Sequence, residues 1–192
     1  VTWCPRCATA LAEAEVEYWD EEDPSIYVKF KSADSDEYLL IWTTTPWTLP
    51  ADLAVTVHPE FMYVKAKATR GAKSEVLIFV KDRLEDIKTI GRYDTIEVLG
   101  ELLGSQLEGQ KYIQPLEDEV PLHKGMNENW VHKVVVGDSV TNENTGCVHT
   151  APGHGPEDFE IGKRYELPPF CPVDGTGHFT ADAGKYSGME LK

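Results

Sequence analysis

The chain has 192 residues, and its 33 acidic and 18 basic side chains give a formal net charge of −15. This length predicts one domain with a substantial core, and the negative charge argues against a broad electrostatic grip on nucleic acid, so any such contact must be local. No run of eighteen apolar residues and no secretory leader pattern occur, which predicts a cytoplasmic protein without a membrane span.

The first 23 residues combine a Cys-x-x-Cys pair with a run of acids, and we expect residues 1–23 to form a peripheral N-terminal arm beside a domain over residues 24–192. Cys4 and Cys7 have the spacing of half a zinc site. A structural zinc needs four ligands, however, and the sequence has no second Cys-x-x-Cys. We therefore expect no metal in this chain alone. The four cysteines form no dense disulfide pattern, which favours a reducing setting, and the first residue, Val1, suggests an internal piece of a longer protein.

Short apolar runs separated by polar turns predict a mainly β fold, because β-branched and aromatic residues favour strands. The runs lie at 26–30, 38–42, 53–57, 62–68, 76–80 and 130–136. The first two predict a hairpin, and Leu84 and Ile87 among charges predict a short surface helix that ends before Gly91. Together these features predict an α+β protein with a β-barrel-like core or sandwich of short mixed strands and a few peripheral helices.

A hydroxyl-rich segment, Trp-Thr-Thr-Thr-Pro-Trp-Thr-Leu-Pro, occupies residues 42–50. Pro46 lacks an N–H donor and disfavours helical angles at the residue before it, so the preceding strand is expected to stop and turn here. Four hydroxyls and two indoles at a strand end indicate a pocket wall, although three threonines can also be plain strand formers at an exposed edge. Strand geometry alone cannot place Thr43, Thr44 and Thr45 on one wall, because alternate side chains face opposite sides.

A second motif over residues 145–159 predicts a strand, a glycine-rich turn and a helix start. Pro156 suits the first helical turn, which places Glu157 and Asp158 near the helix N-terminus. An acid at this position interacts favourably with the helix dipole and stabilises the helix by about 0.3–1 kcal/mol. We prefer this simple interpretation for Glu157. His149 lies in the apolar strand, where a packing role is the default and a general base or metal ligand is the alternative.

The two motifs together resemble the inserted editing (connective peptide) domain of isoleucyl-tRNA synthetase, a class I aminoacyl-tRNA synthetase, of the bacterial type. The resemblance rests on the run at 42–50 and on Gly-Cys-Val-His-Thr-Ala-Pro-Gly-His-Gly-Pro-Glu-Asp-Phe at 146–159, and it extends over the Trp-Cys-x-x-Cys and Ala-Glu-Ala-Glu-Val-Glu-Tyr runs between Trp3 and Tyr18. Valyl and leucyl editing domains have an arginine after two threonines, where this chain has Thr45. The isoleucyl assignment is therefore favoured.

The resemblance implies an aminoacyl-tRNA deacylase that hydrolyses misactivated valyl-adenylate and valine-charged isoleucine tRNA as part of the ligase. An isoleucine pocket cannot strongly reject valine, because one missing methylene is worth only about 1–3 kcal/mol, a magnitude measured on this very class of synthetase. The implied partners are the 3′ acceptor end of isoleucine tRNA, valyl-adenylate and the remainder of the synthetase. Editing would need no cofactor, and zinc would be bound only in the full-length parent. A non-catalytic module that docks the tRNA acceptor end, or a valyl or leucyl editing domain, are the alternatives.

The resemblance also assigns roles to individual residues. Asp158 would hold the substrate ammonium through charge-assisted hydrogen bonds worth about 1.5–3 kcal/mol. His149 would bound the side-chain pocket and exclude isoleucine, and a positioned water with the substrate's ribose hydroxyl would carry out hydrolysis. The family usually has Asn at the position of Asp52, and His154 is a secondary candidate. The candidate catalytic residues are Asp158, Thr45 and Thr44, and the candidate substrate-binding residues are Thr43, Thr44, Thr45, Trp47, Thr48, His149, Ala151 and Asp158.

Overall fold

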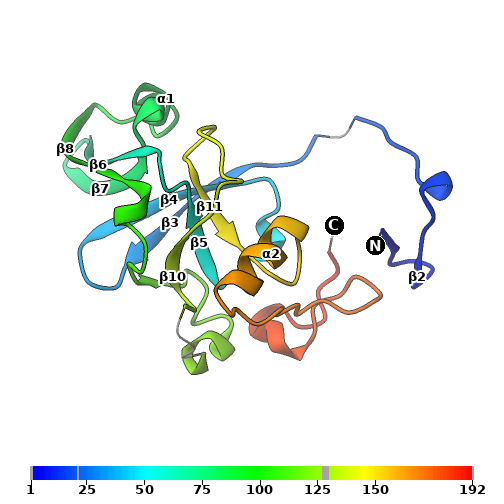
Figure 1. The fold of residues 1–192 in the computed structure, drawn as a ribbon. Helices are drawn as coiled ribbons and strands as arrows, with labels where there is room; N and C mark the ends of the chain where they lie inside the picture. The colour runs from blue at the N-terminus through cyan, green and yellow to red at the C-terminus, as the bar shows by residue number, and fades with distance from the viewer. Residues whose placement is uncertain (1, 21, 127–129, 192) are drawn as a thin grey trace.

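The computed structural model describes residues 2–20, 22–126 and 130–191, and it consists mainly of β-strands with two short α-helices (Figure 1). A six-stranded sheet has the order β8-β6-β7-β4-β3-β9. Its strands are β3 (Ile26–Ser32), β4 (Glu37–Thr43), β6 (Met62–Arg70), β7 (Lys73–Val80), β8 (Thr95–Leu103) and β9 (Tyr112–Ile113). A three-stranded sheet has the order β10-β5-β11, with β5 (Ala54–Val57), β10 (Lys133–Val136) and β11 (Cys147–Thr150).

The predicted hairpin is confirmed, because β3 and β4 pair antiparallel from Ile26 opposite Thr43 to Lys31 opposite Tyr38. Both sheets are mixed. β4 pairs parallel with β7, and β5 pairs parallel with β10 but antiparallel with β11. The central strands therefore come from distant parts of the chain, and the end of β4 meets β11 across the two sheets.

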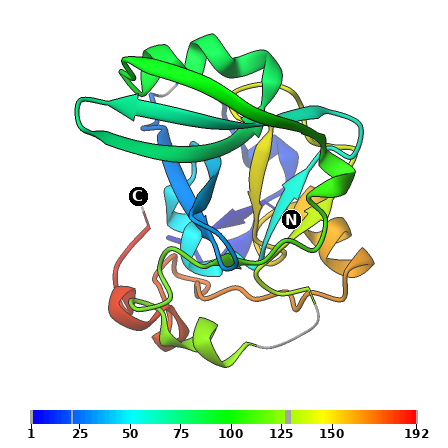
Figure 2. The ribbon, with the colours of Figure 1, turned by 90° about the vertical axis from the view of Figure 1, so that its left-hand side faces the viewer.

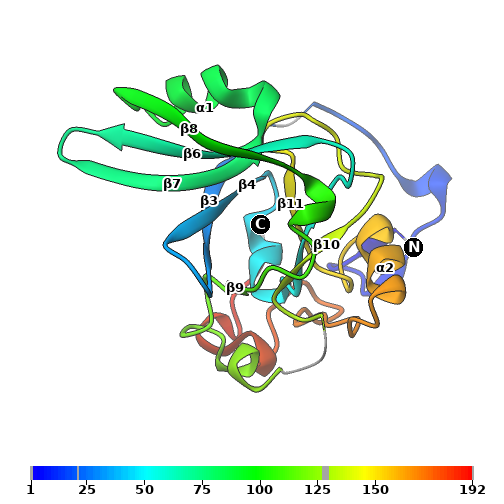
Figure 3. The same ribbon diagram turned by 60° about the vertical axis from the view of Figure 1, so that its left-hand side comes forward.

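The six-stranded sheet is covered on both faces. The helix α1 (Leu84–Ile90), preceded by the 3-10 turn η3 (Lys81–Arg83), lies along β6, β7 and β8 (Figure 3), and Ile87 packs there among buried side chains of β6 and β7. The main core lies on the other face. Its largest members include Phe30, Tyr63 and Ile78, and each buried side chain of this size stabilises the fold by about 1.5–3 kcal/mol.

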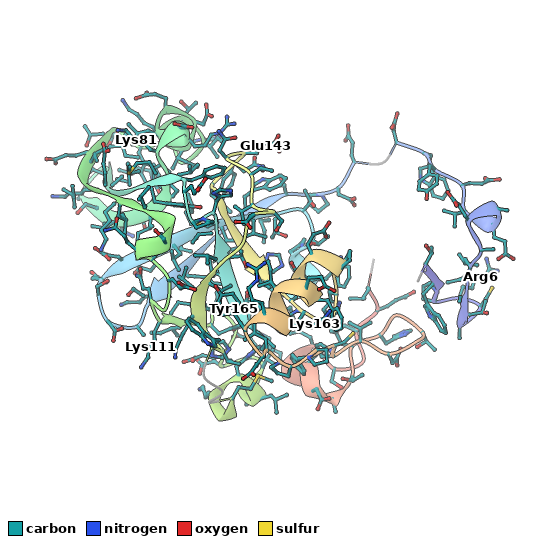
Figure 4. The ribbon with its side chains drawn as sticks, in the orientation of Figure 1. Arg6, Lys81, Lys111, Glu143, Lys163 and Tyr165 are labelled. Carbon is teal, nitrogen blue, oxygen red and sulfur yellow. The ribbon has the colours of Figure 1, made fainter. Side chains whose placement is uncertain are left out.

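The helix α2 (Pro156–Arg164) packs beside the three-stranded sheet. Ile161 and Tyr165 bury their side chains with Ala54 and Val135. Tyr165, which Figure 4 labels, also accepts the Val136 N–H at 3.0 Å and donates its hydroxyl to Glu108 at 2.6 Å. These contacts fix the end of α2, so its first turn has a defined position relative to β11.

The predicted mainly β class with few helices is confirmed, but within the described residues the hydrogen-bonded strands form open sheets and not a closed barrel (Figure 2). The edge strands of the six-stranded sheet are β8 and β9. β9 has only two residues, which is too short to continue the ladder. The remaining 3-10 turns are η1 (Glu13–Glu15), η2 (Pro46–Ala51), η4 (Gly104–Gln106), η5 (Pro121–Gly125) and η6 (Ala181–Tyr186).

The N-terminal segment leaves the body of the molecule and returns toward the C-terminal segment (Figure 1). It contains the small hairpin β1 (Trp3–Cys4) and β2 (Thr9–Ala10), and the Trp3 indole N–H donates to the Gly175 carbonyl at 2.7 Å. Arg6 lies at its far end, remote from α2 (Figure 4). The division into an arm over residues 1–23 and a domain over residues 24–192 stays a prediction.

Two negative findings concern the part of the chain that the structure describes. No group of three or more His, Cys, Asp or Glu side chains is arranged to hold a metal ion there; Cys4 Sγ accepts the Cys7 N–H at 3.4 Å, but no third ligand joins the pair. In the same ranges, every helix is too short or too polar to cross a membrane.

Gly104 predicts a measurable packing defect. A Cβ atom at this position would lie 2.0 Å from the backbone oxygen of His58 and 2.9 Å from the Tyr63 ring. Gly104→Ala should therefore destabilise the fold by about 1–3 kcal/mol and lower the melting temperature by roughly 2–12 °C in a thermal denaturation experiment. Gly100→Ala is the matched control, because a Cβ there meets nothing within 4 Å. Equal melting temperatures for the two variants would contradict the packing at Gly104.

Candidate functional site

The threonine-rich segment leaves the sheet at the point where β4 ends. Pro46 begins η2, as the proline geometry predicted. The backbone N–H of Thr45 donates to Thr43 Oγ1 at 3.0 Å, and the two hydroxyl oxygens lie 3.3 Å apart. Because the chain turns immediately after Thr43, strand alternation no longer applies, and Thr43, Thr44 and Thr45 all line one pocket.

The second motif brings a carboxylate to the same place. α2 begins at Pro156 after an extended Gly155, and Asp158 lies in the first helical turn. Its Oδ2 accepts the backbone N–H of Ala151 at 3.0 Å, which ties the helix start to the end of β11. The carboxyl group is thus held by a contact to the strand in addition to its helical position.

These elements enclose a pocket of about 330 Å³. It is lined by Trp42, Thr43, Thr44, Thr45, Trp47, Thr48, Val148, His149, His154, Gly155, Glu157 and Asp158. Every candidate site residue lies on this wall except Ala151, whose side chain is completely buried and which contributes its N–H to Asp158. Two segments about a hundred residues apart in the sequence therefore form one site.

His149 and Thr48 form a buried pair between the two segments. His149 Nε2 and Thr48 Oγ1 are 2.6 Å apart, and the Thr48 hydroxyl donates to the Thr45 carbonyl at 2.8 Å. Because the hydroxyl has only one proton, this arrangement assigns the N–H to Nε2 and leaves Nδ1 as an acceptor. Nδ1 is buried and without a hydrogen-bond partner among the described residues.

The His149 ring is neutral at physiological pH. Burial, together with a smaller effect of the nearby His154, lowers its pKa to about 4. Only 7 % of the residue is exposed. A neutral, hydrogen-bonded ring of this kind forms a rigid wall, which agrees with the packing role expected for a histidine in an apolar strand.

Asp158 is half-buried, and burial is the main cause of its raised pKa. The negative charge of Glu157 raises the pKa further, while the Ala151 N–H opposes both effects. A cation bound in the pocket would favour the ionised carboxylate. The site is therefore suited to a positively charged ligand group beside polar hydroxyls.

The candidate list from the sequence did not name Trp42 and Val148, gave Glu157 only a helix-dipole role and kept His154 as a secondary candidate, but all four line the pocket. His154 packs edge-on against Trp47, with ring centroids 5.4 Å apart, and burial lowers its pKa. The signal that could have found it is the glycine on either side, because a turn of this kind brings its central side chain over the neighbouring segment.

Asp52 does not line the pocket but lies behind it. The side chain is completely buried, accepts the Tyr112 hydroxyl at 2.6 Å and accepts the Thr150 N–H at 3.3 Å. Burial raises its pKa well above the usual range, and the charge of Asp158 adds to this effect. Asp52, at the position where the family usually has Asn, is therefore not part of the pocket lining.

The wall of the pocket contains hydroxyl, imidazole and carboxyl groups but no activated thiol. Cys147 is buried with a pKa raised by burial, as expected for a small packing residue. The arrangement can hold an ammonium group, bind polar oxygens and limit the size of an apolar side chain.

Comparison with known sequences gives matches that cover the whole of this chain. The chain is 55 % identical over 193 aligned residues to the isoleucine–tRNA ligase of Archaeoglobus fulgidus and 54 % identical to that of Methanothermobacter marburgensis; each match covers 100 % of this chain but only 19 % and 17 % of the ligase. The chain thus spans less than a fifth of the relatives it matches. No protein-family profile matches the sequence.

Comparison with solved structures identifies the fold. The cytosolic leucyl-tRNA synthetase editing domain of P. knowlesi matches with a TM-score of 0.57 at 14 % identity, and GlLeuRS-CP1 matches with a TM-score of 0.52 at 17 % identity; each match covers 76 % of this chain and 66 % of the other. The resemblance predicted from the two motifs is confirmed, as is the fold class. The bacterial type gains no support from the organisms of these relatives and stays a prediction.

Proposed function

Because the chain corresponds over its whole length to a segment of isoleucine–tRNA ligases and has the fold of a synthetase editing domain, we propose that it is the editing domain of such a ligase. It hydrolyses misactivated valyl-adenylate and valine-charged isoleucine tRNA. The observation that carries this proposal is that Asp158, the threonine-rich turn and His149 line one pocket.

Each feature has a function in the proposed site. Asp158 binds the ammonium group of the amino acid, since an ionised carboxylate forms the stronger, charge-assisted hydrogen bonds. Thr44 and Thr45 are exposed in the pocket and bind the substrate's carbonyl and ribose oxygens or an attacking water. His149, held by Thr48, limits the side-chain space together with the lining residues Trp47 and Thr43, so that valine fits and isoleucine does not.

Hydrolysis at this site is a water reaction. The water oxygen forms a bond to the carbonyl carbon, and the bond from that carbon to the ribose oxygen or to the adenylate phosphate oxygen breaks. The leaving oxygen takes a proton, and valine leaves as the free acid. The substrate's own ribose hydroxyl assists the water, and the pocket contributes by holding the two reactants in position.

The partners of this reaction are the 3′ acceptor end of isoleucine tRNA, valyl-adenylate and the remainder of the synthetase, in the cytoplasm. Editing itself needs no cofactor. Cys4 and Cys7 offer two of the four thiolates that a structural zinc requires, and no third ligand joins them in the described ranges, so this chain alone does not fit the metal. A complete site would take its other ligands from the remainder of the parent protein.

The proposal predicts selective binding of the smaller aminoacyl group. In calorimetric titrations of the chain, a non-hydrolysable valyl-adenylate analogue should bind about 5- to 150-fold more tightly than the isoleucyl analogue, which corresponds to about 1–3 kcal/mol for one methylene. The parent ligase should also release valine from valine-charged isoleucine tRNA faster than isoleucine.

Three outcomes would contradict this function. Equal affinity for both analogues would remove the proposed sieve. Selective binding without any release of valine by the parent ligase would instead indicate a module that only docks the acceptor end. A preference for a threonyl or norvalyl analogue would indicate a valyl or leucyl editing domain.

A further inference from the structure

Asp52 is a completely buried carboxyl group with two neutral neighbours. Its exposed fraction is 0 %, and it follows η2, where its own backbone N–H donates to the Leu49 carbonyl. Its Oδ2 is 2.6 Å from the Tyr112 hydroxyl, and its Oδ1 accepts the Thr150 N–H at 3.3 Å. In the part of the chain that the structure describes, no basic side chain stabilises a charge on Asp52.

The titratable groups around this carboxyl supply no positive charge either. Asp158, on α2, is acidic, and its negative charge disfavours ionisation of Asp52. His132 packs edge-on against Tyr112, and His123 bonds to the Pro50 carbonyl at 2.9 Å. Burial lowers the pKa of both histidines, to about 4 for His132, so both are neutral at pH 7. A buried carboxylate in these surroundings would lack the ionic partner that buried charges require.

We propose that Asp52 is uncharged at neutral pH and is a positioning residue. As a neutral acid it links Tyr112 of β9 to Thr150 at the end of β11. The next residue, Ala151, donates its N–H to Asp158 of α2, so this link helps to position Asp158. The protonated form keeps both contacts. One oxygen still accepts the Thr150 N–H, and the acid hydroxyl pairs with the Tyr112 hydroxyl. Thr150 and Ala151 are consecutive, so their two N–H groups are held by Asp52 and Asp158 respectively.

The consequence is a division of charge between two carboxyl groups on either side of one backbone segment. Asp158 faces the pocket and can ionise, whereas Asp52 lies in the interior and stays neutral. A second negative charge behind the pocket would oppose ionisation of Asp158. The benefit for ammonium binding rests on the proposed function, but the protonation state of Asp52 does not depend on it.

Carbon-13 NMR of the 192-residue chain, labelled at the aspartate side-chain carboxyl carbon, tests this proposal without any ligand. At pH 7, one aspartate resonance should have the chemical shift of a protonated carboxyl, and Asp52→Asn should remove it. The proposal is wrong if every aspartate resonance of the wild-type chain has the shift of a carboxylate at pH 7. This criterion needs no variant, so it holds even if Asp52→Asn fails to fold.

Thermal denaturation over a range of pH gives an independent readout. The folded-state pKa of Asp52 is raised, so the stability that its protonated form contributes is present at low pH and is lost as the pH rises through that value. Asp52→Asn lacks this titration. The melting temperature of Asp52→Asn should therefore increase relative to that of the wild type as the pH rises. A difference in melting temperature that is the same at every pH would contradict the proposal. Because neither readout measures hydrolysis, an inactive domain would leave the test intact.

Discussion

Replacing Asp158 with Ala is expected to weaken binding of the valyl-adenylate analogue by about 10- to 150-fold. A hydrogen bond to a charged group contributes about 1.5–3 kcal/mol, and each 1.4 kcal/mol changes the dissociation constant tenfold. Asp158 is the carboxyl group of the pocket that is both half-buried and fixed, since its Oδ2 accepts the Ala151 N–H at 3.0 Å. Isothermal titration calorimetry with the analogue measures the change directly.

The matched control is Glu157→Gln, which removes the neighbouring carboxylate from the same helical turn. Glu157 also lines the pocket, but it is exposed, and exposed charges interact weakly across solvent. We expect less than a threefold change in affinity for this variant. If Glu157→Gln weakens binding as much as Asp158→Ala, the ammonium site is at Glu157 and the assignment of Asp158 is wrong.

The pH dependence of binding identifies the same group. The ligand ammonium requires the ionised form of Asp158, whose pKa in the free protein is raised by burial. As the pH falls through this raised value, the carboxyl takes up a proton and affinity decreases, at a higher pH than for an ordinary aspartate. In Asp158→Asn, which keeps the acceptor for the Ala151 N–H but no charge, this acid limb should disappear.

The sequence predicted those features of the fold that depend on local patterns. β4 ended shortly before Pro46, Pro156 began α2, and short apolar runs formed β3 and β4. The open sheets were not predictable, because they depend on which strands pair. The parallel pairing of β4 with β7 and of β5 with β10 joins segments that are distant in the chain, and no local periodicity encodes such partners.

The site was predictable where a motif concentrated its chemistry. The threonines stood out because hydroxyls followed an apolar run at turn residues, whereas Asp158 was placed at a helix start by pattern and received its role from the family resemblance. The buried position of Asp52 was not predictable in this way, because it depends on a hydrogen bond with Tyr112, which lies 60 positions away in a two-residue strand. Val148 was missed for a related reason, since its exposure near the pocket depends on the packing of α2 beside β11.

His149→Ala is expected to reduce the preference for the valyl over the isoleucyl analogue by about 5- to 150-fold, mainly through tighter binding of the isoleucyl analogue. The ring is a wall of the pocket and is held rigidly by the 2.6 Å contact to Thr48. Its removal opens space for at least the one methylene that distinguishes the two side chains, and that methylene is worth about 1–3 kcal/mol. Parallel titrations with both analogues give the ratio.

His149→Phe separates the size of the ring from its hydrogen bond. Phenylalanine keeps the bulk of the wall but leaves the Thr48 oxygen without its donor, which costs about 1–3 kcal/mol of stability. The variant should therefore melt at a lower temperature than the wild type while it still rejects the isoleucyl analogue. If His149→Ala retains the full preference for valine, another residue excludes isoleucine. If His149→Phe loses the preference as His149→Ala does, the hydrogen bond to Thr48 determines the selectivity, because the bulk of the ring alone does not preserve the sieve.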